Sequence, residues 1–190
     1  MKVQNLNKSS QKTRKLIKSV FAEMLSEKRE LGKITVSELV KRADINRGTF
    51  YSHYDDIYAV AEDYENELVE NFFSNAELIA STNAEKFIDS FFSYVKQNDE
   101  NYRMLCKSDD FLLMARKLTH LAVNKLTELC RQDKRIKNRD YLEPEIEMFV
   151  LGLTLEYVKC CRGLTSLTLA DLYGYTKYWL ADFTGRRYEG

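Results

Sequence analysis

The stretch from Arg47 to Tyr54 holds the residues whose types and spacing are most informative about chemistry. It combines a guanidinium, several hydroxyls, a phenol and an imidazole. These groups can hydrogen-bond to the edges of DNA bases and to phosphate oxygens. Gly48 lacks a side chain, so the backbone there can approach another surface closely. The composition predicts a surface that binds double-stranded DNA, and it also fits an ordinary solvent-facing helix.

A short helix is expected just before this stretch, over residues 35–43. Its first residue, Thr35, stands three positions before Glu38, which is the spacing of a capping box at a helix start. The helix has one apolar face, which predicts that it packs against a core. The residues of that face are Val36, Leu39, Val40 and Ala43.

A sharp corner is expected at Asp44, followed by a second helix from Arg47 to about His53. Asp is one of the few residues other than Gly that tolerate a left-handed backbone. Asn46 is placed to cap the second helix, and Ile45 would fill the angle between the two helices. A helix this short is not stable alone, so its neighbours must hold it. The arrangement is typical of a helix-turn-helix.

The stretch and its flanks resemble the DNA-binding domain of the TetR (tetracycline-repressor) family of bacterial regulators. The matching motifs are Thr-Val-x-x-Leu in the first helix, Ala-Asp-Ile-Asn-Arg-Gly at the corner and Thr-Phe-Tyr-x-His-Tyr after it. The family usually has Gly where this chain has Asp44, Phe where it has Tyr54, and a phosphate-contacting Lys where it has Ile57. An Asp-Ile-Tyr run at 56–58 is similar to the subgroup of dihydroxyacetone-kinase operon regulators.

The resemblance covers about residues 10–60, and beyond them the chain is similar to the family only in the number and length of its helices. It implies which side chains would meet a DNA operator. The predicted base readers are Thr49, Tyr51 and Arg47. The predicted phosphate contacts are Lys12, Thr35, Ser37, His53 and Tyr54. Asn46 and Gly48 complete the predicted DNA-binding set.

The distribution of charge fits a nucleic-acid surface at one end of the chain. The whole sequence has 29 Lys and Arg residues and 29 Asp and Glu residues. Residues 1–54 hold twelve of the cations and five of the acids, a net charge of +7, which leaves −7 for residues 55–190. Such an asymmetry is typical of an electrostatic footprint for nucleic acid, although charge alone also fits a solvated face.

No arrangement typical of a catalytic or metal site is found in the sequence. His53 and His120 lie far apart, and there is no GxSxG, P-loop or HExxH motif. We therefore expect no enzyme activity, no metal and no cofactor. The cysteines lack zinc-site spacing and are expected to be free, mostly buried side chains. They are Cys106, Cys130, Cys160 and Cys161.

The sequence predicts an all-α protein of about nine helices, because breakers are few and apolar residues recur at helical spacing. There is one proline and there are seven glycines in 190 residues. The domains expected are a three-helix DNA-binding domain over 1–54 and a helical effector-binding and dimerisation domain over 55–190. No apolar run approaches a membrane span and no signal peptide is evident, so we expect a cytoplasmic protein without a membrane partner.

Several helix ends follow from local signals. The first helix is expected after a loose, polar start to about Ser9 and is expected to stop at Gly32. A long helix is expected from Asp55 to about residue 80. Thr82 or Asn83 is expected to cap the helix that follows. Further along, Gly163 is expected to end a helix, residues 168 and 171 to form a capping box, and residue 185 to end the last helix.

The helix from about Pro144 to Gly163 has two apolar faces, so it is expected to be buried on two sides. One bundle of this size cannot cover both faces, and the last helix adds more aromatic area. We therefore predict a two-fold dimer through these two helices, as the family resemblance also implies. The predicted interface residues are Leu151, Leu155, Val158, Leu172, Tyr175 and Trp179.

Large residues on the helices of the second domain are candidates for an effector pocket, which the resemblance implies. They are Phe72, Phe91, Tyr94, Tyr102, Met114, Leu118 and Tyr157. For any one of these residues, simply filling a core is the favoured interpretation. Two control mechanisms stay open: a small-molecule effector that releases or modulates a DNA-bound repressor, and a protein partner. The helix from Asp55 is expected to transmit the change, because it alone reads as continuous between the two domains.

Overall fold

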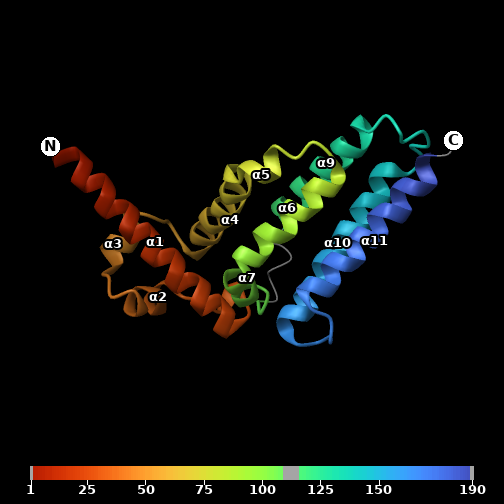
Figure 1. Ribbon diagram of the computed structural model, residues 1–190. Helices are drawn as coiled ribbons and strands as arrows, with labels where there is room; N and C mark the ends of the chain where they lie inside the picture. Colours follow the sequence, from red (N-terminus) through yellow and green to blue (C-terminus); the bar gives the residue numbers. More distant parts are fainter. Residues whose placement is uncertain (1, 109–115, 189–190) are drawn as a thin grey trace. The chain divides into compact units, whose positions relative to one another are not determined.

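The computed structural model of the protein describes residues 2–108 and 116–188 (Figure 1). Over these residues the chain forms helices joined by turns, without a strand. The predicted all-α class is therefore confirmed. The helices are α1 (Lys2–Lys28), the 3-10 helix η1 (Leu31–Lys33), α2 (Val36–Arg42), α3 (Arg47–Tyr51), α4 (Ile57–Ser74), α5 (Ala76–Ile79), α6 (Ala84–Gln97), α7 (Asp99–Leu105), α9 (Arg116–Gln132), α10 (Leu142–Arg162) and α11 (Leu169–Tyr188).

The described residues divide into two compact units. The first holds residues 2–67 and 104–108, and the second holds residues 68–103 and 116–188. The sequence prediction divided the chain by function after Tyr54, whereas the boundary between compact units falls inside α4, between Glu67 and Leu68. The assignment of DNA binding to one part of the chain and of effector binding and dimerisation to the other stays a prediction.

The core of the first unit explains how the very short α3 can be stable. One face of α1 is apolar, with side chains three and four positions apart, and it is buried together with residues of α2, α3 and α4. Burying one such side chain contributes roughly 1.5–3 kcal/mol, which outweighs the weak intrinsic stability of a single helical turn. The side chains with no exposed surface are Ile17, Phe21, Met24, Leu25, Leu39, Phe50 and Val60.

The first helix differs from the prediction at both ends. It begins at Lys2, so the loose start to about Ser9 was a wrong prediction, and it ends at Lys28. Arg29, with φ of 64°, adopts the left-handed conformation that follows the helix, and its N–H donates to Leu25 O at 2.9 Å. Gly32 was predicted to be the stop because glycine favours that conformation, but it lies in η1.

The predicted long helix from Asp55 to about residue 80 is interrupted. α4 ends at Ser74, and Asn75 has an extended backbone. The Asn75 side chain accepts hydrogen bonds from the N–H groups of Glu77 and Leu78, both at 3.1 Å, and so caps α5. Asn favours caps over helix interiors because its side chain competes for backbone N–H groups. The prediction was wrong at this point.

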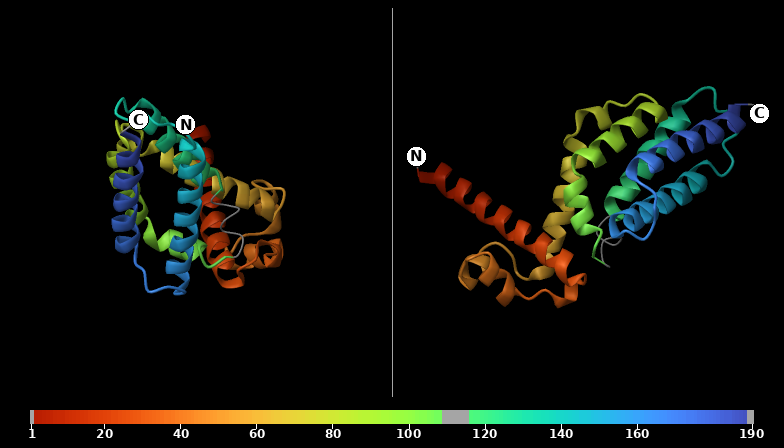
Figure 2. Two further views of the ribbon diagram at one scale, coloured as in Figure 1. Left: turned by 90° about the vertical axis from the view of Figure 1, so that its right-hand side faces the viewer. Right: turned by 60° about the horizontal axis from the view of Figure 1, so that its bottom comes forward.

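In the second unit, α10 packs against α9 and α11, and α6 packs against the same two helices (Figure 2). Two predicted helix ends are confirmed. Asn83 accepts from the N–H of Lys86 at 2.9 Å and caps α6, and Gly163, with φ of 68°, ends α10. The buried residues where α6 meets α11 are Ile88, Phe92, Leu172 and Leu180.

The start of α11 is confirmed and its end is not. Thr168 and Asp171 form the predicted capping box: the N–H of Thr168 donates to the carboxylate at 2.8 Å, and the N–H of Asp171 donates to the hydroxyl at 3.2 Å. Gly185 was predicted to close the helix, but α11 continues to Tyr188. A helical glycine costs only about 1 kcal/mol relative to Ala, and packing overrides it.

The cysteines are all free. Cys106 and Cys130 are buried as predicted, whereas Cys160 and Cys161 are partly exposed. Burial and the nearby Asp133 carboxylate raise the pKa of Cys130 to about 11, so its thiol stays protonated and packs as a small apolar group. Within the described ranges no cluster of His, Cys, Asp or Glu could hold a metal ion, and no helix is long and apolar enough to cross a membrane.

Candidate nucleic-acid interface

The start of α2 is formed by the predicted cap. Thr35 has an extended backbone, and its hydroxyl accepts from the N–H of Glu38 at 3.3 Å. The carboxylate of Glu38 pairs with Lys28 and, at 3.3 Å, with Arg42, so it ties α2 to α1 and to its own last turn. These pairs lower the pKa of Glu38, the hydrogen bond from Lys28 being the main cause.

The corner between α2 and α3 has the predicted geometry. Asp44 adopts a left-handed backbone with φ of 50°, and the N–H of Ile45 donates to Val40 O at 3.0 Å. Asn46 then caps α3, its side-chain oxygen accepting from the N–H of Thr49 at 2.7 Å. The expected helix-turn-helix is therefore present in the first unit.

Gly48 has a structural role beside its predicted close approach to DNA. A Cβ added there would lie 3.2 Å from the side-chain oxygen of Asn46, the atom that caps α3. Any larger residue at this position would press on the cap. The absence of a side chain therefore protects the start of α3 and leaves its backbone exposed.

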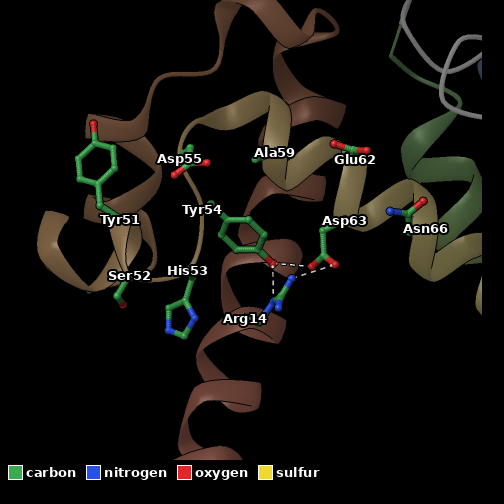
Figure 3. Close-up of a pocket in the computed structure, with 10 residues that line it drawn as sticks. All are labelled: Arg14, Tyr51, Ser52, His53, Tyr54, Asp55, Ala59, Glu62, Asp63 and Asn66. Atoms are coloured by element: carbon green, nitrogen blue, oxygen red, sulfur yellow. Dashed lines mark hydrogen bonds and ion pairs between the residues drawn. The ribbon is translucent and has the colours of Figure 1, made fainter.

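The outer side of α3 is polar and aromatic. Arg47 and Ser52 are exposed, Thr49 is half-buried, and the side chain of Tyr51 is 54% exposed while Phe50 beside it is fully buried. Figure 3 shows Tyr51 pointing away from the contact between Tyr54 and the α4 helix. The predicted base readers thus lie on one short helix that is anchored by Phe50 from behind.

Two predicted phosphate contacts are exposed, Thr35 at the cap of α2 and Ser37 in its first turn, and His53 is half-buried after α3. Arg47 donates a hydrogen bond from its guanidinium to the Ser37 hydroxyl. A predicted base reader and a predicted phosphate contact are therefore neighbours across the corner. The structure brings most of the predicted set onto the surface of the helix-turn-helix.

Lys12 lies on α1 within a stripe of three lysines. Lys8, Lys12 and Lys15 are exposed, and their spacing of four and three places them on one side of the helix. No ion pair of these three lysines is found among the described residues. They therefore form a cationic edge of the first unit, with the predicted phosphate contact Lys12 between Lys8 and Lys15.

Tyr54 differs from the other predicted DNA contacts. Its side chain is 5% exposed, and its hydroxyl donates to Asp63 Oδ2 at 2.6 Å. Arg14 of α1 donates to the same hydroxyl at 3.4 Å, and its guanidinium lies 5.2 Å from the ring centroid. Burial and the hydrogen bond to Asp63 raise the pKa of Tyr54 to about 12. The structure places Tyr54 in an internal contact and not with the exposed set.

This internal contact borders a depression of about 370 Å³ in the first unit (Figure 3). Arg14 pairs with Asp63 Oδ1 at 3.1 Å, and Lys18 pairs with Asp63 Oδ2 at 3.2 Å. Although burial alone would raise it, the pKa of Asp63 is lowered by hydrogen bonds from Tyr54 and Lys18 and by the charges of Lys18 and Arg14. Sequence reasoning gave no role to Lys18 and Asp63, because it found no signal that α1 and α4 meet there.

The predicted effector-pocket residues form an aromatic cluster in the second unit. Phe72, Tyr94 and Tyr102 are buried. The ring of Tyr94 lies 6.2 Å from that of Phe72 and 6.4 Å from that of Tyr102. Phe91 lies 6.4 Å from Phe72. The second unit also has a depression of about 290 Å³, and it is lined by other residues, among them Cys130.

Two further pocket candidates, Leu118 and Tyr157, are partly buried. The hydroxyl of Tyr157 donates to Asp99 at 3.1 Å, and Leu118 is half-buried on α9. Met114 lies outside the described residues. The proximity of four aromatic candidates supports a common cluster, and its role as an effector pocket stays a prediction.

The predicted dimer residues separate into two groups. Leu151, Leu155 and Tyr175 are exposed, and Trp179 is half-buried. Val158 and Leu172, in contrast, are buried inside the second unit, so they belong to its core. Two further apolar side chains of these helices, Met148 on α10 and Tyr178 on α11, are 66% and 72% exposed.

Comparison with known proteins gives one short similarity to report. A segment of 43 residues is 37% identical to part of a protein of Bacillus subtilis (strain 168) described as the uncharacterized HTH-type transcriptional regulator YxbF. The segment is 23% of this chain and covers 11% of the length of that protein. No protein-family model matches the chain. The relative is described as a helix-turn-helix regulator, which agrees with the helix-turn-helix geometry of α2 and α3 in this chain.

Proposed function

We propose that the protein is a TetR-like transcriptional repressor that binds a near-palindromic DNA operator as a dimer, with α3 as its recognition helix. The observation that carries the proposal is the capped, rigidly seated α3 with its polar outer side. The side chains on that outer side, a guanidinium, a hydroxyl with a methyl group and an exposed phenol, are groups that read base edges in the major groove.

Base reading would fall to Arg47, Thr49 and Tyr51. An Arg can pair with two acceptors of guanine, and the methyl group of a Thr can contact thymine in the major groove. Phe50 and the Asn46 cap would hold these groups in a fixed orientation. Because each good base contact discriminates by roughly 1–3 kcal/mol, three such residues are enough for a selective half-site.

Phosphate contacts would come from the flanks of α3. Thr35, Ser37 and His53 surround it, and Lys12 stands in the cationic stripe of α1. Lysines without acidic partners can neutralise phosphates and release counterions, which makes binding strongly dependent on salt. Tyr54 is left out of this set, because its hydroxyl is already held by Asp63.

Dimerisation would use the exposed apolar side chains of α10 and α11. Met148, Leu151 and Leu155 on α10 and Tyr175 and Tyr178 on α11 are all exposed, and large exposed apolar patches mark interaction sites. A two-fold contact pairs the same surface on two copies. Two copies also supply two recognition helices, as a site with half-sites roughly 34–36 Å apart requires.

Release or modulation by a small-molecule effector would involve the aromatic cluster of Phe72, Phe91, Tyr94 and Tyr102. A pocket of mostly aromatic side chains with a few hydroxyls suits a small organic molecule. A protein partner is the second candidate for control. Leu164 and Leu167, in the connection between α10 and α11, are 70% and 42% exposed and would suit such a partner.

Selection of duplexes from a random library by the purified protein, followed by binding titrations, tests the proposal. The Tyr51→Ala variant should bind the selected duplex with an affinity lower by about 1–3 kcal/mol and should discriminate less at one base position. The matched control is Tyr141→Ala, which removes an exposed tyrosine of the second unit. Equal binding by the wild type and the Tyr51→Ala variant would refute the assignment of α3.

A further inference from the structure

We propose that the hydroxyl of Tyr54 is a positioning group that fixes the recognition helix to α1 and α4. The inference rests on the proposed function, DNA binding through α3. The group of residues that carries it is here named the Tyr54 clamp. It consists of Arg14, Lys18, Tyr54, Asp63 and Glu67.

The ring of Tyr54 and its hydroxyl do two different things. The ring packs 6.1 Å from that of Phe50, the fully buried anchor of α3. The hydroxyl reaches beyond this packing and donates to Asp63 at 2.6 Å (Figure 3), a length typical of a strong hydrogen bond to a carboxylate. The ring could therefore pack without the hydroxyl, but only the hydroxyl joins the end of the recognition helix to α4.

The carboxylate of Asp63 is the point where three segments meet. It accepts from Tyr54, pairs with Arg14 at 3.1 Å and pairs with Lys18 at 3.2 Å. Lys18 also pairs with Glu67, one turn further along α4. Because Asp63 is only 25% exposed, these contacts are screened by water less than ordinary surface pairs.

Both partners of the central hydrogen bond are in the right protonation state at neutral pH. Burial and the Asp63 hydrogen bond raise the pKa of Tyr54 to about 12, so the phenol keeps its proton. The pKa of Asp63 is lowered by Tyr54, Lys18 and Arg14 against the effect of burial, so it stays a carboxylate. The donor and the charged acceptor therefore persist throughout the physiological range.

The backbone carries the position of Tyr54 into α3. The N–H groups of His53 and Tyr54 both donate to Phe50 O, at 2.9 and 3.0 Å. A movement of α4 that displaces Asp63 would pull on the Tyr54 hydroxyl. Through these backbone hydrogen bonds it would also pull on the last turn of the recognition helix. Through the clamp, the recognition of DNA sequence by α3 would depend on the position of α4.

The clamp also engages two cations of α1 in ion pairs. Arg14 and Lys18 are paired with acids, whereas Lys8, Lys12 and Lys15 on the same helix have no ion pair among the described residues. Removing the Asp63 charge would free Arg14 to attract phosphate. Position and charge can therefore be tested by separate substitutions.

Tyr54→Phe removes only the hydroxyl and tests position. The probes are the tightest duplex that the wild-type protein selects from a random library and a scrambled duplex of the same composition. We expect affinity for the selected duplex to fall about tenfold, with affinity for the scrambled duplex and the salt slope unchanged. Tyr58→Phe, at an exposed tyrosine of α4, is the matched control.

Asp63→Asn keeps the shape of the side chain, removes its charge and tests the second role of the clamp. We expect a smaller preference for the selected over the scrambled duplex and a steeper salt dependence, by up to about 0.9 in slope for each new phosphate contact. All titrations are done below the unfolding temperature of each variant, as shown by circular dichroism. A role in stability alone would change neither the preference nor the slope.

The outcomes separate the inference from the proposed function. If Tyr54→Phe keeps the affinity and preference of the wild type, or weakens both duplexes equally, the inference is overturned. If Tyr54→Phe cannot be folded, the unchanged preference of Asp63→Asn would overturn it. If the wild-type protein itself selects no duplex, the proposed function fails.

Discussion

The outer side of α3 and the outer side of α10 and α11 both expose tyrosines, but the other exposed side chains on the two surfaces differ in chemistry. Tyr51 shares its helix with Arg47 and Thr49, whereas Tyr175 and Tyr178 lie on α11, which packs against the helix that exposes Met148, Leu151 and Leu155. The first setting suits a hydrated, charged partner such as DNA. The second suits a dry contact driven by burial of apolar surface, at about 25 cal/mol per Å². The neighbours of a tyrosine, more than the tyrosine itself, indicate the partner.

The largest expected effect comes from placing a charge in the apolar surface. Leu151→Glu should convert the dimer to a monomer at low micromolar concentration, because an unpaired carboxylate in the contact costs about 3 kcal/mol or more. Analytical ultracentrifugation measures the mass, and Ile79→Glu, at an exposed residue of α5, is the control. A wild-type protein that is monomeric both on and off DNA would contradict the assignment of this surface.

Tyr54 is a third kind of tyrosine, buried and hydrogen-bonded to a carboxylate. The contribution of its hydroxyl to stability should be measurable at alkaline pH. Its folded pKa of about 12 lies above the ordinary value of 10.0. Its contribution to stability is therefore complete below about pH 10 and is lost as pH rises towards 12, on the order of 2 kcal/mol at most. Urea melts of the wild type and of Tyr54→Phe should converge in this range.

Tyr64 shows the same direction of shift, with its pKa raised to about 12 by burial and by the charge of Glu67. The comparison with Tyr54→Phe is needed for this reason, because Tyr64 contributes equally to both melts. An equal loss of stability in the two proteins between pH 10 and 12 would show that the Tyr54 hydroxyl contributes nothing.

Removing the cap of α3 should cost less free energy than placing a charge in the dimer contact. Asn46→Ala removes the acceptor for the N–H of Thr49 and should lower the free energy of unfolding by about 1 kcal/mol. Asn83→Ala removes the corresponding cap of α6 and should cost a similar amount. Only the first substitution should also weaken binding to the selected duplex. If both variants bind like the wild type, the geometry of α3 is not tied to DNA.

The smallest effect is expected in the salt dependence of binding. It should distinguish the DNA-binding surface from the dimer contact most clearly. Lys12→Ala should weaken binding to all duplexes alike and should reduce the salt slope by about 0.9, one phosphate contact. Lys86→Ala, at an exposed lysine of α6, should leave the slope unchanged. The dissociation constant of the dimer should hardly depend on salt. A strongly salt-dependent dimer would mean that its contact is charged.

The parts of the fold that follow from local chemistry could be predicted from the sequence. Thr35, Asp44 and Asn46 define the helix-turn-helix because a cap or a left-handed turn depends on only a few neighbouring residues. Gly163 ended α10 for the same reason. Where two local signals compete, prediction failed: Asn75 broke a helix that apolar spacing had extended.

Contacts between elements far apart in the sequence could not be predicted. Periodicity assigned Val158 to an interface, but it cannot tell whether a second copy or the protein's own core covers an apolar face. The prediction assigned Tyr54 to phosphate. The partners that bury it, Arg14 and Asp63, lie on two other helices, and no local signal connects them to Tyr54. The helix-turn-helix could thus be predicted from the sequence, whereas the contact of Tyr54 with Asp63 after α3 could not.

The most direct test of the central claim is to sequence the duplexes that the wild-type protein selects from a random library. The account predicts an enriched, near-palindromic site with two half-sites, centred about one helical turn or a multiple of it apart. Tyr51→Ala should lose preference at the same position in both half-sites. Enrichment of no sequence, or of a single half-site bound by a monomer, would contradict it.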